Sequence, residues 1–188
     1  MTAEHLLDLT CHPSTRTEIA RAVQVLVRRK ACELQMTFRL DGDLPRIRIP
    51  SAGAPRIGTE LWRHTCFEAF IALEGQSAYH EFNFAPSGEW CVYALSGYRN
   101  GGPVADRKLR PHIAMRPTGS RLDLDTIVRL DSLSVIHPRA GLRIGLSAVI
   151  EASDGTFSYW ALRHSADKPD FHNADGFALR LEPPGPEQ

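Results

Sequence analysis

Between Glu60 and Gly75 the chain reads ELWRHTCFEAFIALEG, and the middle of this stretch alternates with the period of two that β-strands show. One set of alternate side chains is almost wholly apolar: Thr65, Phe67, Ala69, Ile71 and Leu73. The other set places Glu68 among sulfur and hydrocarbon side chains. A carboxylate in such surroundings is costly unless it is solvated, paired or hydrogen-bonded. Glu68 therefore marks the face of this strand on which a function can lie.

Apolar alternation recurs along the chain and predicts an all-β protein, because a sustained helical period is almost absent. The segment RIRIP, which ends at Pro50, is predicted to be a short strand, and Arg99 to Pro111 a long polar connection. Roughly ten short strands, separated by turn signals such as PSG and NGGP, indicate a sandwich or a barrel. The clearest element is a hairpin across a basic turn, with the apolar sets Val23, Val25, Val27 and Leu34, Met36, Phe38, Leu40.

Length and composition limit the classes of protein that remain. A chain of 188 residues favours one domain, which we place at residues 1–182, followed by a disordered tail at residues 183–188. Lys plus Arg equals Asp plus Glu at 22 each, which argues against nucleic-acid binding. No apolar run approaches the length of about 20 residues that a membrane span needs. We therefore expect neither nucleic acid nor membrane as a partner, and leave the oligomeric state open.

The compartment is predicted from the N-terminus and the cysteines. The first residues lack the basic start and the apolar run of a secretory signal. The four cysteines form no CxxC pair, and their spacing fits no zinc module. Free thiols are typical of a reducing compartment, so a cytoplasmic location is expected.

The parity of consecutive strands places several polar residues on one face. If the strand around Glu68 is followed by AYHEFNFA across the GQS turn, the phenylalanines of both strands point to the core. The opposite face then collects a group of polar residues, namely His64, Glu68, Tyr79, Glu81 and Asn83. This group indicates either a solvated outer surface or a pocket for a ligand that supplies donors.

Aromatic and basic residues near this group favour a ligand of a particular kind. Flat rings beside carboxylates and amides suit sugars, because C–H faces stack on rings while hydroxyls are hydrogen-bonded at the sides. Arg99, Lys168 and His172 are predicted to contact an acidic substituent. The aromatic candidates are Trp62, Trp90, Tyr93 and Trp160. The alternative is that the tryptophans lie in the core.

The segment from His164 to Phe177, HSADKPDFHNADGF, is rich in possible metal ligands. Its oxygens suit calcium, and histidine with aspartate suits a transition metal. The spacing matches no EF-hand and no HExxH, and Asp side chains also hydrogen-bond their own turns. Haem is a further alternative, with Met36 or Met115 and a histidine as axial ligands. No spacing selects a pair, so we assign no metal ligand and no cofactor.

Catalysis finds less support than binding. No GxSxG occurs, and Cys66 and Cys91 lie inside predicted strands with nothing that marks a low-pKa thiol. Glu68 and Glu81 on neighbouring strands leave a paired-carboxylate glycosidase as an alternative, because strands lie about 4.8 Å apart. We assign no catalytic residue and leave enzymatic activity open.

Four blocks of the sequence resemble the DOMON-like domains of bacterial proteins, relatives of the family-nine carbohydrate-binding modules and of the DOMON haem- or sugar-binding domains. The likeness runs from about Leu6 to Leu181. The blocks are LWRHTCFEAFIA, YHEFNFAPSGEWCVYALSGYRNG, LSAVIE and YWALRHSADKPDFHNADGF.

This resemblance implies an antiparallel, jelly-roll-like β-sandwich of about ten strands with a ligand site on its concave face. It also implies binding of sugar or haem, with no catalysis assigned to the family as a whole. Two departures stand out: the sequence shows neither the signal peptide nor the adjoining catalytic domain of secreted relatives, and no Met/His haem pattern. The expected function is binding of a carbohydrate or similar polar small molecule, such as a cell-wall sugar fragment. The expected alternatives are a small carbohydrate-active enzyme and a haem-binding domain.

Overall fold

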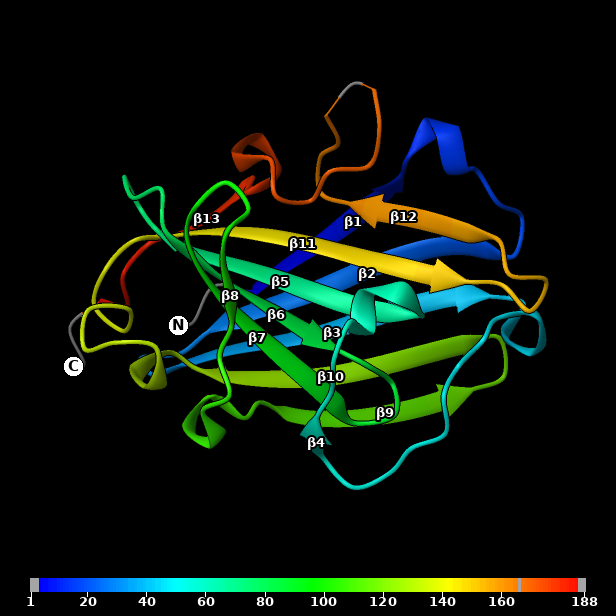
Figure 1. Cartoon of the computed structure of the whole chain (residues 1–188), viewed down its shortest axis with the longest axis horizontal. Coiled ribbons are helices and arrows are strands. Elements are labelled where there is room, and N and C mark those ends of the chain that lie inside the picture. The colour runs from blue at the N-terminus through cyan, green and yellow to red at the C-terminus, as the bar shows by residue number, and fades with distance from the viewer. Residues whose placement is uncertain (1–3, 166, 186–188) are drawn as a thin grey trace.

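The computed structural model describes residues 4–165 and 167–185, and within them the regular structure is β-strand and short 3₁₀ helix (Figure 1). None of the described helices is long and apolar enough to cross a membrane. Residues 183–185 of the predicted disordered tail have no regular structure, and 186–188 lie outside the described residues. The strands are β1 (Glu4–Cys11), β2 (Ala20–Arg29), β3 (Glu33–Gly42), β4 (Arg56–Ile57), β5 (Cys66–Leu73), β6 (Tyr79–Phe84), β7 (Glu89–Gly97), β8 (Asn100–Pro103), β9 (His112–Thr118), β10 (Arg121–Arg129), β11 (Leu142–Glu151), β12 (Phe157–Ala161) and β13 (Leu179–Leu181).

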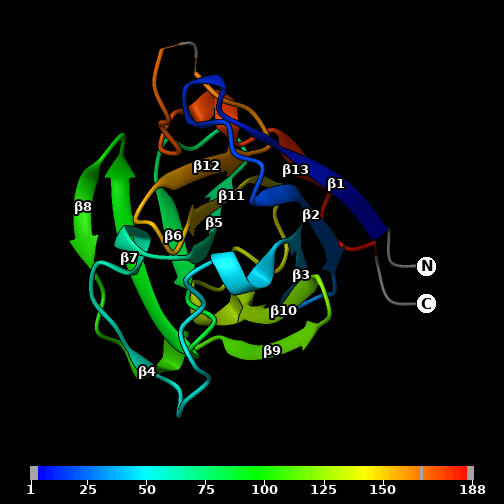
Figure 2. The ribbon, with the colours of Figure 1, turned by 90° about the vertical axis from the view of Figure 1, so that its right-hand side faces the viewer.

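The described strands form one continuous 13-stranded sheet, in the order β4-β7-β6-β5-β11-β12-β1-β2-β3-β10-β9, with β13 beside β11 and β8 beside β7. The sheet curls around a core (Figure 2). The all-β prediction is confirmed, but a sandwich of two sheets and about ten strands is not. The reason lies in β1, which pairs with β2 along most of its length and with β12 at Thr10 and Cys11, and so joins the two halves.

Individual strand predictions were confirmed where one face enters the core. The predicted hairpin is β2 and β3, whose inward valines, Met36 and Phe38 are fully buried. The predicted short strand at RIRIP is wrong, since Ile47 makes only an isolated bridge to Ala152. The polar connection that starts at Arg99 contains β8, which pairs with β7.

The core is formed by the inward faces of both halves of the sheet. Phe67, Ile71, Phe82 and Phe84 of β5 and β6 point into it, as the parity of their strands predicts. The opposite face of β5, β6, β7 and β11 is the one turned toward the viewer in Figure 1. A 3₁₀ helix, η3 (Leu61–Arg63), and the connection between β12 and β13 lie over that face. The polar residues singled out by their parity stand there.

Candidate functional site

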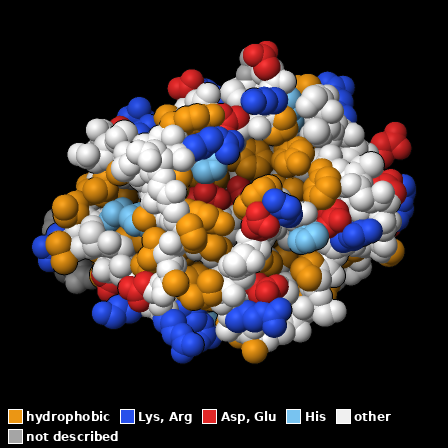
Figure 3. All heavy atoms as spheres, in the orientation of Figure 1, with side chains coloured by type: hydrophobic (Ala, Val, Ile, Leu, Met, Phe, Trp, Pro, Cys, Tyr) orange, Lys and Arg blue, Asp and Glu red, His pale blue; other side chains and the backbone are white. Residues whose placement is uncertain are grey.

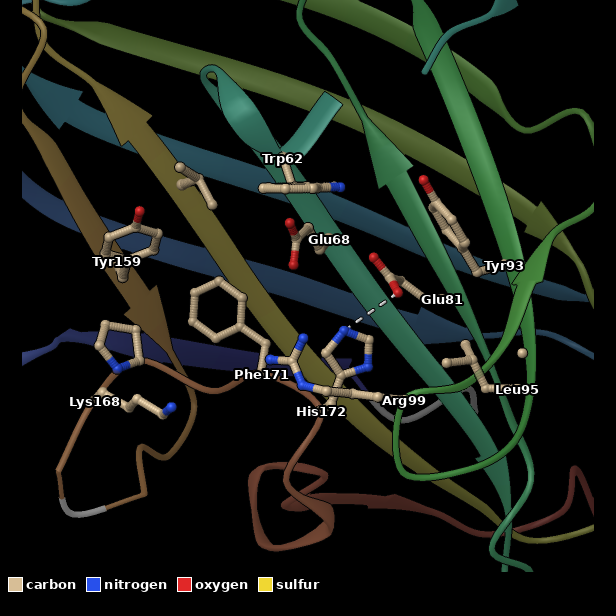
Figure 4. A pocket seen from close by; sticks show the side chains of 13 residues that line it. Trp62, Glu68, Glu81, Tyr93, Leu95, Arg99, Tyr159, Lys168, Phe171 and His172 are labelled. Carbon is tan, nitrogen blue, oxygen red and sulfur yellow. Dashed lines mark ion pairs between the residues drawn. The ribbon is translucent and has the colours of Figure 1, made fainter. Parts of the chain in front are cut away.

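The register of β5 and β6 brings the two acids to the same side of the sheet. Asn83 lies directly opposite Glu68, and Phe70 directly opposite Glu81, so both carboxyls project from the face away from the core. The predicted convergence of Glu68, Glu81 and Asn83 is therefore confirmed. Figure 4 shows the two carboxyls at the base of a common cavity.

The cavity has a volume of about 540 Å³, within the range of small-molecule sites. Figure 3 shows it as a hollow with acidic oxygens at its base and apolar side chains around them. Its floor comes from strands, and its rim from η3, the β7–β8 turn and the β12–β13 connection. The lining residues are Trp62, Glu68, Glu81, Tyr93, Leu95, Arg99, Gly101, Val149, Tyr159, Lys168, Pro169, Phe171 and His172.

Glu68 is an acid held in a poorly hydrated position. Its side chain is 2% exposed, and its Oε2 accepts a hydrogen bond of 2.9 Å from Ser147 Oγ on β11. Burial, and then the neighbouring Glu81, raise the pKa of Glu68 to about 8. Glu68 therefore carries a proton at neutral pH and presents a neutral carboxyl group to the cavity.

Glu81 is supported from behind by an amide. Asn83 Nδ2 donates a hydrogen bond of 2.7 Å to Glu81 Oε1, and both side chains are almost fully buried. Burial raises the pKa of Glu81 from its ordinary value, and the hydrogen bond from Asn83 opposes that rise. Asn83 does not itself line the cavity and instead holds Glu81 in position.

Tyr79 and His172 form a second supported pair beside Glu81. The buried Tyr79 hydroxyl lies 2.8 Å from His172 Nδ1 and accepts a hydrogen bond of 3.3 Å from the backbone N–H of Arg99. Because a buried phenol needs an acceptor for its proton, we assign Tyr79 as the donor to Nδ1. His172 is then the Nε2–H tautomer, with Nε2 3.7 Å from Glu81 Oε2. That separation is too long for a hydrogen bond.

The imidazole of His172 is expected to stay neutral well below neutral pH. Burial, and then the charge of Arg99, lower the pKa of His172 to about 4. Nitrogen-15 NMR of the wild type should show the Nε2–H tautomer at pH 6, and protonation only near pH 4. In the Tyr79→Phe protein a population with the proton on Nδ1 should appear. Titration of wild-type His172 near pH 6.5 would contradict this assignment.

Arg99 closes one side of the cavity through its pairing with the β12–β13 connection. Its Nη2 donates to Asp170 Oδ1 at 2.8 Å, and Tyr98 Oη donates to Asp170 Oδ2 at 2.8 Å. Despite burial, these hydrogen bonds from Tyr98 and Arg99 lower the pKa of Asp170. The backbone of Arg99 lies in the left-handed region, with φ of 51°, a conformation that non-glycine residues seldom adopt. The predicted contact of Arg99 with an acidic ligand therefore competes with an internal partner.

Aromatic side chains form the walls. Trp62 on η3 is 43% exposed, which is high for a tryptophan. Tyr159 and Phe171 also line the cavity, and the centroids of these two rings lie 6.1 Å apart. Burial, and then Cys91, raise the pKa of Tyr93 to about 12, so this phenol also stays neutral. Tyr159 and Phe171 were not among the predicted site residues. The outward parity of Tyr159 on its strand was the available signal, whereas a loop residue such as Phe171 has none.

The segment that carries Phe171 and His172 is fixed by packing. Phe177 stacks on Phe70 with ring centroids 5.5 Å apart, beside Tyr79. Gly145 on β11 makes this possible, because a Cβ there would lie 2.7 Å from Phe177 Cδ1. The outer face of the sheet thus holds its own small apolar cluster, and the rim of the cavity rests on it.

Five of the predicted site residues do not line this cavity: Tyr79 and Asn83 hydrogen-bond to lining residues, and His64, Trp90 and Trp160 lie elsewhere. Trp90 and Trp160 are buried in the core, so the alternative placement of the tryptophans holds for these two. His64 Nδ1 donates a hydrogen bond of 2.8 Å to Glu151 Oε2 and lines a second cavity of about 440 Å³. Trp90 lies opposite Phe84 on β6, which fixes its side chain on the core face. Lys168 lines the main cavity with an exposed side chain.

The cavity does not fit haem, and the His164–Phe177 segment does not gather metal ligands. One histidine and no methionine are among the lining residues, and Met36 is buried in the core. Both Asp170 oxygens already accept hydrogen bonds from Tyr98 and Arg99. Within residues 4–165 and 167–185, no group of three or more His, Cys, Asp or Glu could hold a metal ion.

A known structure shares the fold. A protein from Bacteroides uniformis described as a candidate for carbohydrate binding superposes with a TM-score of 0.69 and 13% identity, over 93% of this chain and 84% of its own. The chain therefore belongs to the same structural class of all-β protein. Family 9 carbohydrate-binding modules from Caldicellulosiruptor kristjanssonii, in complex with cellotriose or glucose, give a TM-score of 0.45 and 10% identity over 82% of this chain and 75% or 77% of theirs. No protein-family model and no curated protein matches the sequence.

Proposed function

We propose that the chain binds a carbohydrate or a similar polar small molecule in the cavity above Glu68 and Glu81. The observation that carries this proposal is a pair of buried carboxyls at the base of an aromatic-walled cavity. Sugar hydroxyls can hydrogen-bond to the carboxyl oxygens that face the cavity, and the C–H face of a pyranose can pack on a ring such as that of Trp62. Both requirements meet within one cavity of ligand size.

The shared fold agrees with this proposal, because the Bacteroides protein is itself described as a candidate for carbohydrate binding. The resemblance to DOMON-like domains suggests the finer choice of a cell-wall sugar fragment. Membership of that family, the cytoplasmic location and the absence of nucleic-acid and membrane partners stay predictions.

Replacing Glu81 by Gln is expected to weaken sugar binding severalfold without unfolding the protein. The amide keeps the shape and can still accept from Asn83, but it loses a charge-assisted hydrogen bond to a hydroxyl, worth roughly 1 to 2 kcal/mol. Calorimetry across a panel of sugars and muropeptides measures the change. Glu89→Gln, which alters a carboxylate outside this cavity, is the matched control and should bind like wild type. The absence of heat with wild type across the whole panel would refute the proposal.

A second candidate function is hydrolysis of a glycosidic bond by the same two acids. The observation in its favour is that Glu68, with a pKa of about 8, holds a proton at neutral pH as a general acid must. A chromogenic glycoside panel tests it. Turnover by the wild type that disappears in the Glu68→Gln protein would establish an enzyme. Sugar binding without turnover would support binding as the only function of the cavity.

A further inference from the structure

Each acid of the cavity floor has one occupied and one free oxygen. Ser147 donates to Glu68 Oε2, and Asn83 donates to Glu81 Oε1. No side chain or backbone N–H in the described part of the chain hydrogen-bonds to Glu68 Oε1 or Glu81 Oε2. Both side chains are more than nine-tenths buried and line the cavity. Two carboxyl oxygens therefore face the cavity without a partner from another protein group, and in the free protein at neutral pH the proton of Glu68 lies at this pair.

The positive charges around the cavity do not supply the missing partner. The Arg99 guanidinium is bound to Asp170 at 2.8 Å and to Tyr98 at 3.3 Å. Lys168 is exposed at the edge of the cavity (Figure 4). His172 is neutral for the reasons given above, and its Nε2 stays 3.7 Å from Glu81 Oε2. The floor thus lacks a counter-charge in direct contact.

The walls suit a cation as well as a sugar ring. Trp62, Tyr93, Tyr159 and Phe171 surround the space above the acids, and the faces of such rings attract ammonium groups. An ammonium also offers three N–H donors at one point, whereas a hydroxyl offers one. A single group could thus meet both free oxygens and supply the charge that they lack.

Building on the proposed function, we propose that the preferred ligand is an amino sugar, whose protonated amine binds between Glu68 Oε1 and Glu81 Oε2 while its ring packs on Trp62. Binding of the amine releases the proton that burial, and then Glu81, keep on Glu68 at pH 7 by raising its pKa, because a bound cation favours the ionised pair. The other charged or titratable groups around the pair are Cys66, Tyr79, Cys91, Tyr93, Arg99 and His172.

Calorimetric titration at pH 7 with glucosamine, N-acetylglucosamine and glucose tests the proposal. Glucosamine should bind about tenfold more tightly than the two neutral sugars, because one charge-assisted hydrogen bond replaces a neutral one. N-acetylglucosamine keeps the nitrogen but removes the charge and adds an acetyl group, so glucose, with a hydroxyl at the same position, is the control for the added bulk. Equal or weaker binding of glucosamine would overturn this inference and leave the proposed function standing. Failure of every sugar to bind would overturn both.

Variants locate the effect at the two acids. In Glu81→Gln the ratio of the dissociation constants for neutral and amino sugar should fall severalfold, and in the Glu68→Gln, Glu81→Gln double variant it should fall to about one. Glu89→Gln should keep the wild-type ratio, because Glu89 lies outside the cavity and is paired with Arg56. If the double variant binds neither sugar, the assignment is tested by the ratio of the two dissociation constants in the Glu81→Gln protein alone. A preference for glucosamine that persists in Glu81→Gln at full strength would overturn the assignment.

Discussion

Replacing Arg29 by Met is expected to lower the free energy of unfolding by roughly 3 to 5 kcal/mol, the largest single-residue effect that we predict. Arg29, at the end of β2, is only 6% exposed. Within the described residues no carboxylate forms an ion pair with it. Its guanidinium instead donates to five backbone carbonyls, those of His137, Pro138, Ala140, Leu181 and Glu182.

The expected loss is large because several buried acceptors lose their donor at once. The shortest of these bonds, 2.7 Å to Ala140 and 2.8 Å to Glu182, join the segment before β11 and the end of β13 to β2. Met fills a similar volume but donates nothing, so the carbonyls are left without partners away from water. Arg29→Lys should also destabilise, since one ammonium cannot reach both groups of carbonyls.

Arg28 provides the matched control. It is the neighbouring arginine and points to solvent, where its ion pair with Glu4 at 2.9 Å joins two half-exposed side chains. Such pairs contribute about 0 to 1 kcal/mol, so Arg28→Met should leave stability nearly unchanged. Urea denaturation of the three proteins measures the difference. Equal stability of the Arg28 and Arg29 variants would show that the carbonyls find water or other donors.

The second large effect is a stabilisation that depends on pH. Glu68→Gln is expected to raise the free energy of unfolding at pH 8 by an amount on the order of 4 kcal/mol, and to change it little at pH 4.5. The amide can still accept from Ser147, so the variant keeps the local hydrogen bond while the buried ionisable group is removed.

The sign follows from the proton held by each state. Below its ordinary pKa of 4.5, Glu68 is protonated in both the folded and the unfolded chain and does not affect stability. Between 4.5 and about 8 the folded protein keeps a proton that the unfolded chain has released, so stability falls as pH rises. Above about 8 both states are ionised and the loss is complete. The wild type should therefore be less stable than Glu68→Gln across the upper part of this window.

Glu89→Gln should show the opposite sign. A hydrogen bond from Arg56 is the main cause of the lowered pKa of Glu89, so this carboxylate stabilises the protein above its ordinary pKa and stops doing so on acidification. Thermal unfolding at pH 5 and pH 8 tests Glu68→Gln, and a further measurement near pH 3 tests the loss expected for Glu89. If Glu68→Gln had the same effect at both values, the Glu68 carboxyl would have to be well hydrated in the folded protein.

The sequence was sufficient to predict the strands in which side chains alternate between the core and the outer face. The shared face of Glu68 and Glu81 follows from alternation and one tight turn. Trp90, which was predicted as a site residue, shares its parity with Val92, and the pairing with Phe84 seen in the structure places it in the core instead. β1 was harder to predict, because Leu6 and Leu7 are adjacent apolar residues and Leu6 is 56% exposed.

What the sequence did not predict depends on contacts between distant segments. β8 contains Asn, two glycines and Pro, and becomes a strand only because β7 offers it hydrogen-bonding partners. The closure of the sheet through β1 and β12 depends on two residue pairs at the end of each strand. Phe171 and the pairing of Arg99 with Asp170 belong to connections, where no periodicity indicates direction.

The division of the cavity between strands and connections has a consequence for its evolution. Glu68 and Glu81 stand on strands whose reverse sides pack the core, so an insertion or a shift there would turn every neighbouring side chain over. Arg99, Lys168 and His172 come from connections, which accept substitutions and changes of length far more readily. Natural variation can therefore exchange one ligand for another by altering two loops, while the acidic pair is inherited with the scaffold.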